Sequence, residues 1–151
     1  MDCVFCAIVE GRLPAQLIHQ DEYFLVLMDI HPLRPGHLLI VSREHAPYLS
    51  DLPVAARDRL LILADGISRV QRAAGFGGRG INLLLNDGPD SNQHVPHLHL
   101  HLIPRRRGDV PAFIWRILVR FLPLPRARLE ARLTREAEQL RQGLREVFGR
   151  V

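Results

Sequence analysis

The stretch His97-Leu98-His99-Leu100-His101-Leu102-Ile103 decides the fold, because histidine and leucine alternate along it. In a β-strand, residues two apart point to the same face, so this pattern predicts three imidazoles on one surface and leucines in the core. Packing alone does not explain three neighbouring histidines, since each buried ring needs a hydrogen-bond partner. The run ends at Pro104 and Arg105. We therefore expect a row of potential nucleophiles near a sheet end, within reach of a ligand.

Regular patterns on either side of this strand predict the rest of the domain. Apolar runs predict a hairpin over 17–29 and strands over 37–41 and 81–85, and helical spacing predicts a short helix within 1–13. The same spacing predicts a central helix from Pro53 to Gly75 and a charged amphipathic helix from Leu129 to Phe148. The predicted fold class is α+β, an antiparallel sheet of about five strands with a central helix on one face and a C-terminal helix beyond it.

Two further segments are irregular. Gly75–Gly80 is rich in glycine, but it follows a helix and precedes a strand, and a phosphate-binding loop has the reverse order, so we predict a turn. Residues 110–125 are the most apolar part of the chain and include Trp115, yet they are too short to span a bilayer. We expect them to pack against the sheet or against a partner subunit.

The composition is typical of a single globular domain. The chain has 151 residues, 47% of them apolar, and can bury a core without disulfides. We assign 1–151 to one domain, with a core over 1–107 and a C-terminal extension over 108–151. All 20 basic residues are arginine, which excludes Schiff-base and adenylyl-lysine chemistry. Apart from 105–107 the arginines are dispersed, which favours a solvated surface over a nucleic-acid interface.

The two cysteines, Cys3 and Cys6, are too few for a secreted disulfide framework. No apolar run is as long as a membrane span, and the start lacks the pattern of a signal peptide, so we expect a cytoplasmic protein that binds no membrane. Cys-x-x-Cys supplies half of a tetrahedral zinc site. Free thiols are an alternative, as is a redox disulfide, although that motif belongs after a strand of a βαβ unit.

The stretch Asn86-Asp-Gly-Pro-Asp-Ser-Asn-Gln93-His-Val-Pro-His97-Leu-His99-Leu-His101-Leu-Ile-Pro-Arg105 resembles the signature of the histidine triad family of nucleotide hydrolases and transferases. Upstream, further blocks resemble the family in the family order: Cys3 to Pro14, Leu27-Met-Asp29-Ile30, Pro35-Gly-His37-Leu-Leu-Ile-Val and Arg43-Glu-His45. Transferase branches of the family carry glutamine at the third triad position, so His101 indicates a hydrolase branch.

The resemblance implies a nucleophilic mechanism at the α-phosphate of a nucleoside phosphate derivative. His99 would be the nucleophile, with its far ring nitrogen held protonated by the carbonyl of His97. His37 and His101 would flank the phosphate as hydrogen-bond donors. The product would be a covalent nucleotidyl-histidine that water then cleaves.

The resemblance also implies the surroundings of the nucleotide. Gln93 and Asn86 would contact phosphate or leaving-group oxygens, and Asp29 would accept hydrogen bonds from the ribose hydroxyls. An apolar slot for the base, expected to be a purine, agrees with the apolar lining of most ligand pockets. Its residues would be Phe5, Ile8, Leu13, Leu27 and Ile30, although residues of these types are often simply buried in a core.

Two positions depart from the family pattern. Asn92 stands where glycine is usual, and asparagine also tolerates a positive φ. His94 stands where a serine or threonine commonly assists the leaving group, and an imidazole can act as a general acid near neutral pH. Alternatively, His94 simply faces solvent.

The resemblance extends to a metal site, because family members that keep the cysteine pair resemble zinc proteins with two histidine ligands. These ligands match His45 and His97. A closed set of Cys3, Cys6, His45 and His97 would be structural and would tie the N-terminal helix to the triad strand. A catalytic metal ion held by the histidine row is the alternative.

Together these features predict a homodimeric enzyme that hydrolyses a nucleoside 5′-phosphoramidate or a related nucleoside monophosphate derivative. Dinucleoside polyphosphate hydrolysis is the alternative within the family. A nucleotide-binding scaffold or regulatory module is an alternative of another class. A catalytic zinc hydrolase is a third, in which a metal-bound water would carry the chemistry.

Overall fold

A five-stranded antiparallel sheet forms the centre of the computed structural model, which describes residues 3–122 and 126–149. The strand order is β1-β2-β3-β5-β4, which leaves β1 and β4 at the edges. The strands are β1 (Leu17–Gln20), β2 (Phe24–Met28), β3 (Leu38–Ser42), β4 (Gly80–Leu85) and β5 (His99–Arg105). The predicted α+β fold with an antiparallel sheet is confirmed.

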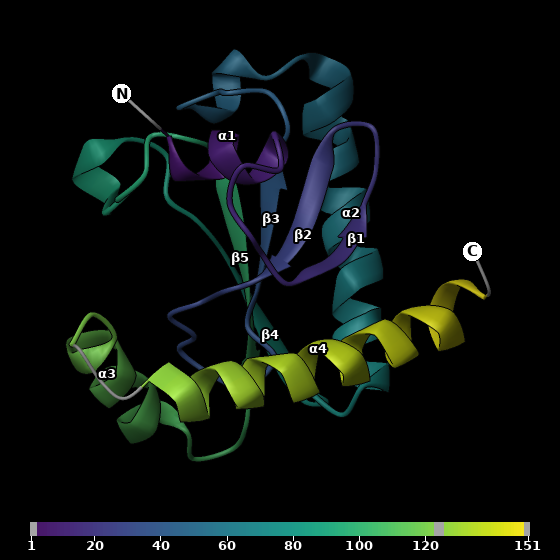
Figure 1. Ribbon diagram of the computed structural model, residues 1–151, viewed down its shortest axis with the longest axis vertical. Helices are drawn as coiled ribbons and strands as arrows, with labels where there is room; N and C mark the ends of the chain where they lie inside the picture. Colours follow the sequence, from purple (N-terminus) through teal and green to yellow (C-terminus); the bar gives the residue numbers. More distant parts are fainter. Residues whose placement is uncertain (1–2, 123–125, 150–151) are drawn as a thin grey trace.

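Helices cover both faces of the sheet (Figure 1). They are α1 (Val4–Val9), α2 (Val54–Ala73), α3 (Val110–Val119) and α4 (Arg126–Phe148), with short 3₁₀ turns η1 (Leu49–Asp51) and η2 (Pro89–Ser91). Helix α2 packs along one face of the sheet, and α4 crosses α2 on the same side. Helix α1 lies on the opposite face of the sheet. Among the described helices, none has the length and apolar character needed to cross a membrane.

The main core lies between the sheet and the helix pair α2 and α4. Leu98, Leu100 and Leu102 point into it, as the alternation predicts. From α4, Leu133, Ala137 and Leu140 are buried in the same cluster. The two helices approach closely at Gly143, where a Cβ would lie 2.8 Å from the Val70 carbonyl oxygen. Helix α4 therefore shares the core of the sheet.

The opposite face of the sheet carries the histidines and a smaller apolar cluster. His99 lies across from Val41 and His101 across from Leu39 in the pairing of β3 with β5. The strand begins at His99 and not at His97, because Pro96 precedes it and Leu98 donates its N–H to the Ala46 carbonyl outside the ladder. The start of the predicted strand is therefore wrong by two residues, although its faces are right.

Helix α3 does not pack against the sheet, so of the two alternatives expected for residues 110–125 the sheet contact is wrong for the helix. None of its residues is buried, and Trp115 is 64% exposed. It is held at its start, where Arg105 donates to Asp109 and lies over the ring of Phe113. Residues 123–125 lie outside the described part of the chain. Packing of this segment on a partner subunit stays a prediction.

Candidate active site and metal centre

Strand register brings Asp29, His37 and His101 together on the face opposite α2. Asp29 follows β2 and His37 precedes β3, and the Asp29 N–H donates to the His37 carbonyl at 3.1 Å. His101 lies on β5 opposite Leu39, two residues beyond His37, and its ring contacts that of His37. All three side chains are buried. Side chains distant in sequence thus meet because alternate residues of a strand share a face with those of the adjacent strand, and diagonal neighbours are within reach.

The hydrogen bonds of His37 and His101 fix where their protons lie. The Leu33 N–H can only donate, and it donates to His37 Nδ1 at 3.1 Å. Neutral His37 therefore carries its proton on Nε2, which lies 2.9 Å from His101 Nδ1 and donates to it. Neutral His101 is then protonated on Nε2, which leaves one N–H to donate to a ligand.

His99 is held in the opposite tautomer. Its Nδ1 lies 2.7 Å from the His97 carbonyl oxygen, which can only accept, so Nδ1 carries the proton. The Nε2 of neutral His99 therefore has a free lone pair. Phe5 of α1 packs beside the His99 ring, with 5.0 Å between centroids. This arrangement presents an oriented nitrogen nucleophile.

Burial keeps these imidazoles neutral. It lowers the pKa of His37 to about 4, against an opposing effect of Asp29. It also lowers the pKa of His101 to about 3, with His37 contributing in the same direction. For His99, burial lowers the pKa although the bond to the His97 carbonyl opposes it. A neutral imidazole is the form that can attack phosphorus.

Asp29 is the acidic group of the site. Burial acts to raise its pKa, but Arg120 and the hydrogen bond from the His31 N–H act in the opposite direction, and the pKa is lowered. The His31 N–H donates to Oδ1 at 2.7 Å, and Arg120 donates to Oδ2 at 3.2 Å. Asp29 is therefore an ionised carboxylate whose two oxygens both have partners in this structure.

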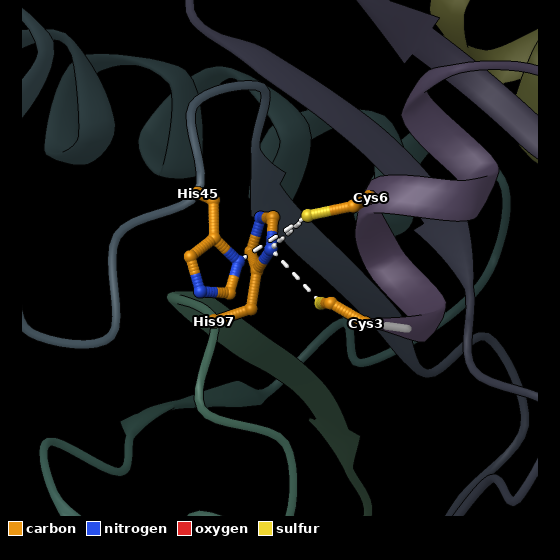
Figure 2. A group of neighbouring side chains, drawn as sticks. All are labelled: Cys3, Cys6, His45 and His97. Atoms are coloured by element: carbon orange, nitrogen blue, oxygen red, sulfur yellow. Dashed lines mark hydrogen bonds between the residues drawn. The ribbon is translucent and has the colours of Figure 1, made fainter. Parts of the chain in front are cut away.

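A second cluster joins the N-terminal helix to the start of the triad strand (Figure 2). The sulfurs of Cys3 and Cys6 point from α1 towards the rings of His45 and His97. His97 Nδ1 lies 3.3 Å from Cys3 Sγ and 3.6 Å from Cys6 Sγ, and His45 Nδ1 lies 3.2 Å from Cys6 Sγ. All four ligand atoms lie within 4.8 Å of one another. The structure thus brings together all four predicted metal ligands.

This cluster has the donor set and the geometry of a tetrahedral zinc site. Zinc bonds of about 2.3 Å to sulfur and about 2.0 Å to nitrogen separate these ligands by roughly 3.5 Å, close to the observed separations. His97 donates Nε2–H to the Ser42 carbonyl at 2.7 Å, so its Nδ1 lone pair faces the sulfurs. A backbone carbonyl that fixes the ligand tautomer is typical of metal-bound histidine. The residues therefore fit a zinc ion.

The polar residues predicted to contact phosphate lie in the loop before β5. Gln93 donates to the Pro47 carbonyl at 2.6 Å, and Asn86 donates to the Asn92 carbonyl at 3.3 Å. Asn92 has a φ of 63°, as its place in the family pattern predicts. His94 is exposed, and its ring contacts Phe121 at 5.4 Å between centroids. These side chains stabilise the loop, and their contact with a substrate stays a prediction.

The five residues predicted to line the base slot fall into two groups. Phe5 and Leu27 are buried in the small apolar cluster beside His99, and Ile8 packs against it. Leu13 and Ile30 are exposed and lie outside that cluster. The structure therefore brings three of the five together.

Sequence reasoning missed Arg120 and Phe121, which come from the end of α3. Arg120 pairs with Asp29, and the ring of Phe121 contacts those of His31 and His94. An arginine directly after a very apolar helix is the local signal for this role. Nothing in its spacing identifies Asp29, which is 91 positions away, as the partner.

The fold and the site agree with comparison to known proteins. The model of the HIT domain matches residues 10–108, so the chain belongs to the HIT-domain family of histidine triad proteins.

Relatives include proteins with and without a named activity. An uncharacterised HIT-like protein of Mycobacterium tuberculosis is 38% identical over 72% of this chain and 75% of its own length. The adenosine 5′-monophosphoramidase of Schizosaccharomyces pombe is 33% identical over 70% of this chain and 75% of its own length. An adenylylsulfatase of Arabidopsis thaliana is 35% identical over 72% of this chain and 54% of its own length.

A solved structure extends the similarity to the C-terminal helices. The zinc-bound histidine triad family protein of Mycobacterium smegmatis superposes with a TM-score of 0.76 and is 34% identical. The match covers 98% of this chain and 96% of that protein. The similarity therefore includes the region around α3 and α4, beyond the matched HIT domain.

Proposed function

We propose that the protein hydrolyses a nucleoside 5′-phosphoramidate or a related nucleoside monophosphate derivative through a nucleotidyl-His99 intermediate. One observation carries this proposal. His99 holds its Nδ1 proton on the His97 carbonyl and so has a free lone pair on Nε2. Beside it, His101 has an N–H left to donate. The monophosphoramidase named among the relatives supports this substrate class.

The reaction has two steps. His99 Nε2 attacks the α-phosphorus, the bond to the leaving group breaks, and the amine departs with a proton. Donors are needed for the charge that develops on the phosphoryl oxygens. His101 Nε2–H would supply one, since His37 Nε2 contacts the opposite nitrogen of that ring. Water then attacks the phosphorus of the nucleotidyl-histidine, which releases the nucleoside monophosphate and restores neutral His99.

The remaining predicted contacts belong to this proposal. Gln93 and Asn86 would turn towards phosphate or leaving-group oxygens, and Asp29 would accept hydrogen bonds from the ribose. A purine base would lie against the apolar cluster of Phe5, Ile8 and Leu27. His94 would donate the proton to the leaving amine, because a protonated imidazole is a general acid.

The cysteine-histidine cluster would hold a structural zinc ion. Four protein ligands leave no open position for an activated water, which is the difference between a structural and a catalytic zinc site. The zinc-bound relative and the fit of the four donors support this assignment. Zinc bound there would stabilise the junction of α1 with the segment before β5.

The active form is proposed to be a homodimer. Strand β4 lies at an edge of the sheet, with Leu83 and Leu84 both exposed. An unpaired edge strand offers its backbone groups to a second chain, and exposed apolar side chains add area that association would bury. The exposed face of α3 around Trp115 is another apolar surface.

A substrate screen tests the proposal. Wild-type and His99→Asn proteins would be assayed with adenosine 5′-phosphoramidate, dinucleoside tri- and tetraphosphates and adenosine 5′-phosphosulfate. The proposal expects the phosphoramidate to have the highest kcat/KM, with turnover lost in the variant. Preference for a dinucleoside polyphosphate would select that alternative, and tight AMP binding with no turnover of any compound would select a binding module.

A further inference from the structure

One oxygen of Asp29 is shared by three groups that can carry positive charge. Arg120 Nη2 lies 3.2 Å from Oδ2, His37 Nδ1 lies 3.5 Å from it, and His101 Nδ1 lies 3.8 Å from it. Of these groups only the guanidinium is charged at every accessible pH. The charge of the carboxylate is therefore balanced by an arginine at the end of α3, in direct competition with two histidines.

This competition decides how the two histidines hold their protons. With Arg120 on Oδ2, His37 Nδ1 needs no proton and accepts the Leu33 N–H instead. Without Arg120, His37 could take up a proton on Nδ1. That N–H would donate to Asp29, and the imidazolium would replace the missing positive charge. His37 would then be an imidazolium, and the Leu33 N–H would lose its acceptor.

The end of α3 is built to keep the guanidinium in this place. The Arg120 side chain is only 18% exposed, although no residue of α3 itself is buried. The guanidinium lies 5.0 Å from the ring centroid of Phe121, and that ring contacts His31 and His94. Arg120 and Phe121 thus anchor a helix that has no buried residue of its own.

We propose that Arg120 is a positioning residue that acts through Asp29. The guanidinium balances the negative charge of the Asp29 carboxylate, so that His37 and His101 stay neutral. His101 then keeps its Nε2–H to donate to the phosphate. The role of that N–H rests on the proposed function. The protonation states of His37 and His101 are a property of the free protein, and they can be measured without a substrate.

Several charged and titratable groups among the described residues lie around this site. Asp29 follows β2, His31 and His37 lie in the segment between β2 and β3, His99 and His101 lie on β5, His94 lies in the preceding loop, and Arg120 ends α3. Arg120 carries the same charge as an imidazolium and so lowers the pKa of His37 and His101, and a charge this close shifts a pKa by about one to three units. Removing Arg120 should therefore raise the pH at which the Asp29–His37–His101 group takes up a proton.

The test is a titration of the histidine side chains by ¹⁵N NMR in the zinc-loaded full-length protein. In Arg120→Gln, the imidazolium signal of His37 or His101 should appear at least about one pH unit above its wild-type position. Arg116→Gln is the control, since it removes the same charge one turn earlier on the same helix, where no ion pair is found with the described residues. Wild-type titration in Arg120→Gln would overturn the proposal.

A double-mutant cycle tests whether the effect passes through Asp29. In an Asp29→Asn background, Arg120→Gln should change the titration by much less than it does in the wild type. An equal change in both backgrounds would contradict a role through the carboxylate. Should Arg120→Gln fold poorly, Arg120→Lys in the wild-type and Asp29→Asn backgrounds gives the same comparison with the charge retained. Arg120→Lys should titrate as the wild type does. If His37 or His101 in Arg120→Lys took up its proton at a pH raised as far as expected for Arg120→Gln, the proposal would be overturned.

Activity separates this proposal from the proposed function. A raised titration without turnover of any nucleotide derivative would support the role of Arg120 and count against the enzymatic proposal. Turnover with an unchanged titration would do the opposite. If both hold, kcat/KM of Arg120→Gln should fall on the acid side of its pH profile by at least about tenfold relative to Arg116→Gln, and less at high pH.

Discussion

His97 connects the cysteine-histidine cluster to His99. Its ring lies in the cysteine-histidine cluster, and its carbonyl oxygen, 2.7 Å from His99 Nδ1, fixes the tautomer of the proposed nucleophile. A structural metal ion would therefore stabilise the backbone that orients His99 while taking no part in bond breaking. This separation of roles can be tested by removing the metal.

Metal removal should lower the stability of the protein more than it lowers the rate of the reaction. The purified protein is expected to carry about one zinc ion per chain. Chelation or Cys3→Ser should lower Tm by at least several degrees, because metal binding energy is folding energy. The kcat of the fraction that remains folded should fall by less than about tenfold, since the attack by His99 needs no metal. Metal content, Tm and kcat would be measured together.

Two outcomes would change this assignment. Wild-type protein free of zinc would remove the metal site. Folded apo-protein that has lost all turnover would move the case to a catalytic metal ion.

The pH dependence of stability should follow the buried histidines. The pKa of His37 is lowered from 6.5 to about 4 and that of His101 to about 3, so between these values and 6.5 the unfolded chain binds more protons than the folded one. Stability is therefore full above about pH 6.5 and decreases as the pH falls towards 4. Both histidines should contribute to this decrease, because each must take up a proton that the folded state disfavours.

Urea unfolding between pH 4 and 8 would measure this trend, with zinc content determined at each pH. A stability that stays constant from pH 7 to 5 in metal-loaded protein would contradict the neutral, buried state of these rings. Because the pKa of His99 is also lowered, kcat/KM should remain near its neutral value at pH 6.5 and decrease only at lower pH.

Asp29 is expected to discriminate ribose from its deoxy analogues. Asp29→Asn should raise KM for an adenosine 5′-phosphoramidate by about tenfold, because a charged acceptor for the ribose hydroxyls is lost. For the 2′,3′-dideoxy analogue the change should be small. Equal changes for both substrates would remove Asp29 from the ribose site and leave it only the charge balance with Arg120.

The proposed dimer should depend on the edge of β4. Leu84→Glu places a charge on an exposed residue of that strand and should shift the protein from dimer to monomer at micromolar concentration, as measured by light scattering. Trp115→Ser is the matched variant on α3. Dissociation by Trp115→Ser alone would place the interface on α3, and a wild-type monomer would remove the dimer altogether.

Local periodicity could predict the sheet and the faces of its strands. The alternation around His99 requires only the period of two of a β-strand, and the cluster of Leu98 and Leu100 confirms it. The start of that strand could not be predicted, because it depends on a hydrogen bond between Leu98 and Ala46, which are distant in sequence. The metal ligands came from a resemblance, since the spacing of Cys3 and Cys6 alone leaves two of the four undetermined.

The contribution of α3 could not be predicted from sequence. Its apolar side chains indicate a buried helix, yet they are exposed here, and the contact that matters for the site comes from Arg120. An ion pair between Arg120 and Asp29 depends on how a helix with few contacts is positioned in space. Composition and periodicity carry no information on that position.

Direct detection of the covalent intermediate tests the central claim. Wild-type protein would be mixed with adenosine 5′-phosphoramidate, denatured at alkaline pH within milliseconds to seconds to preserve a phosphorus–nitrogen bond, and digested for mass spectrometry. His99→Asn would be treated in parallel, with His19→Asn as a control on β1. An adenylyl group is expected on His99 in the wild type and in the His19→Asn variant, and none in His99→Asn. Turnover by His99→Asn at a rate near that of the wild type, or an adduct on another residue, would contradict it.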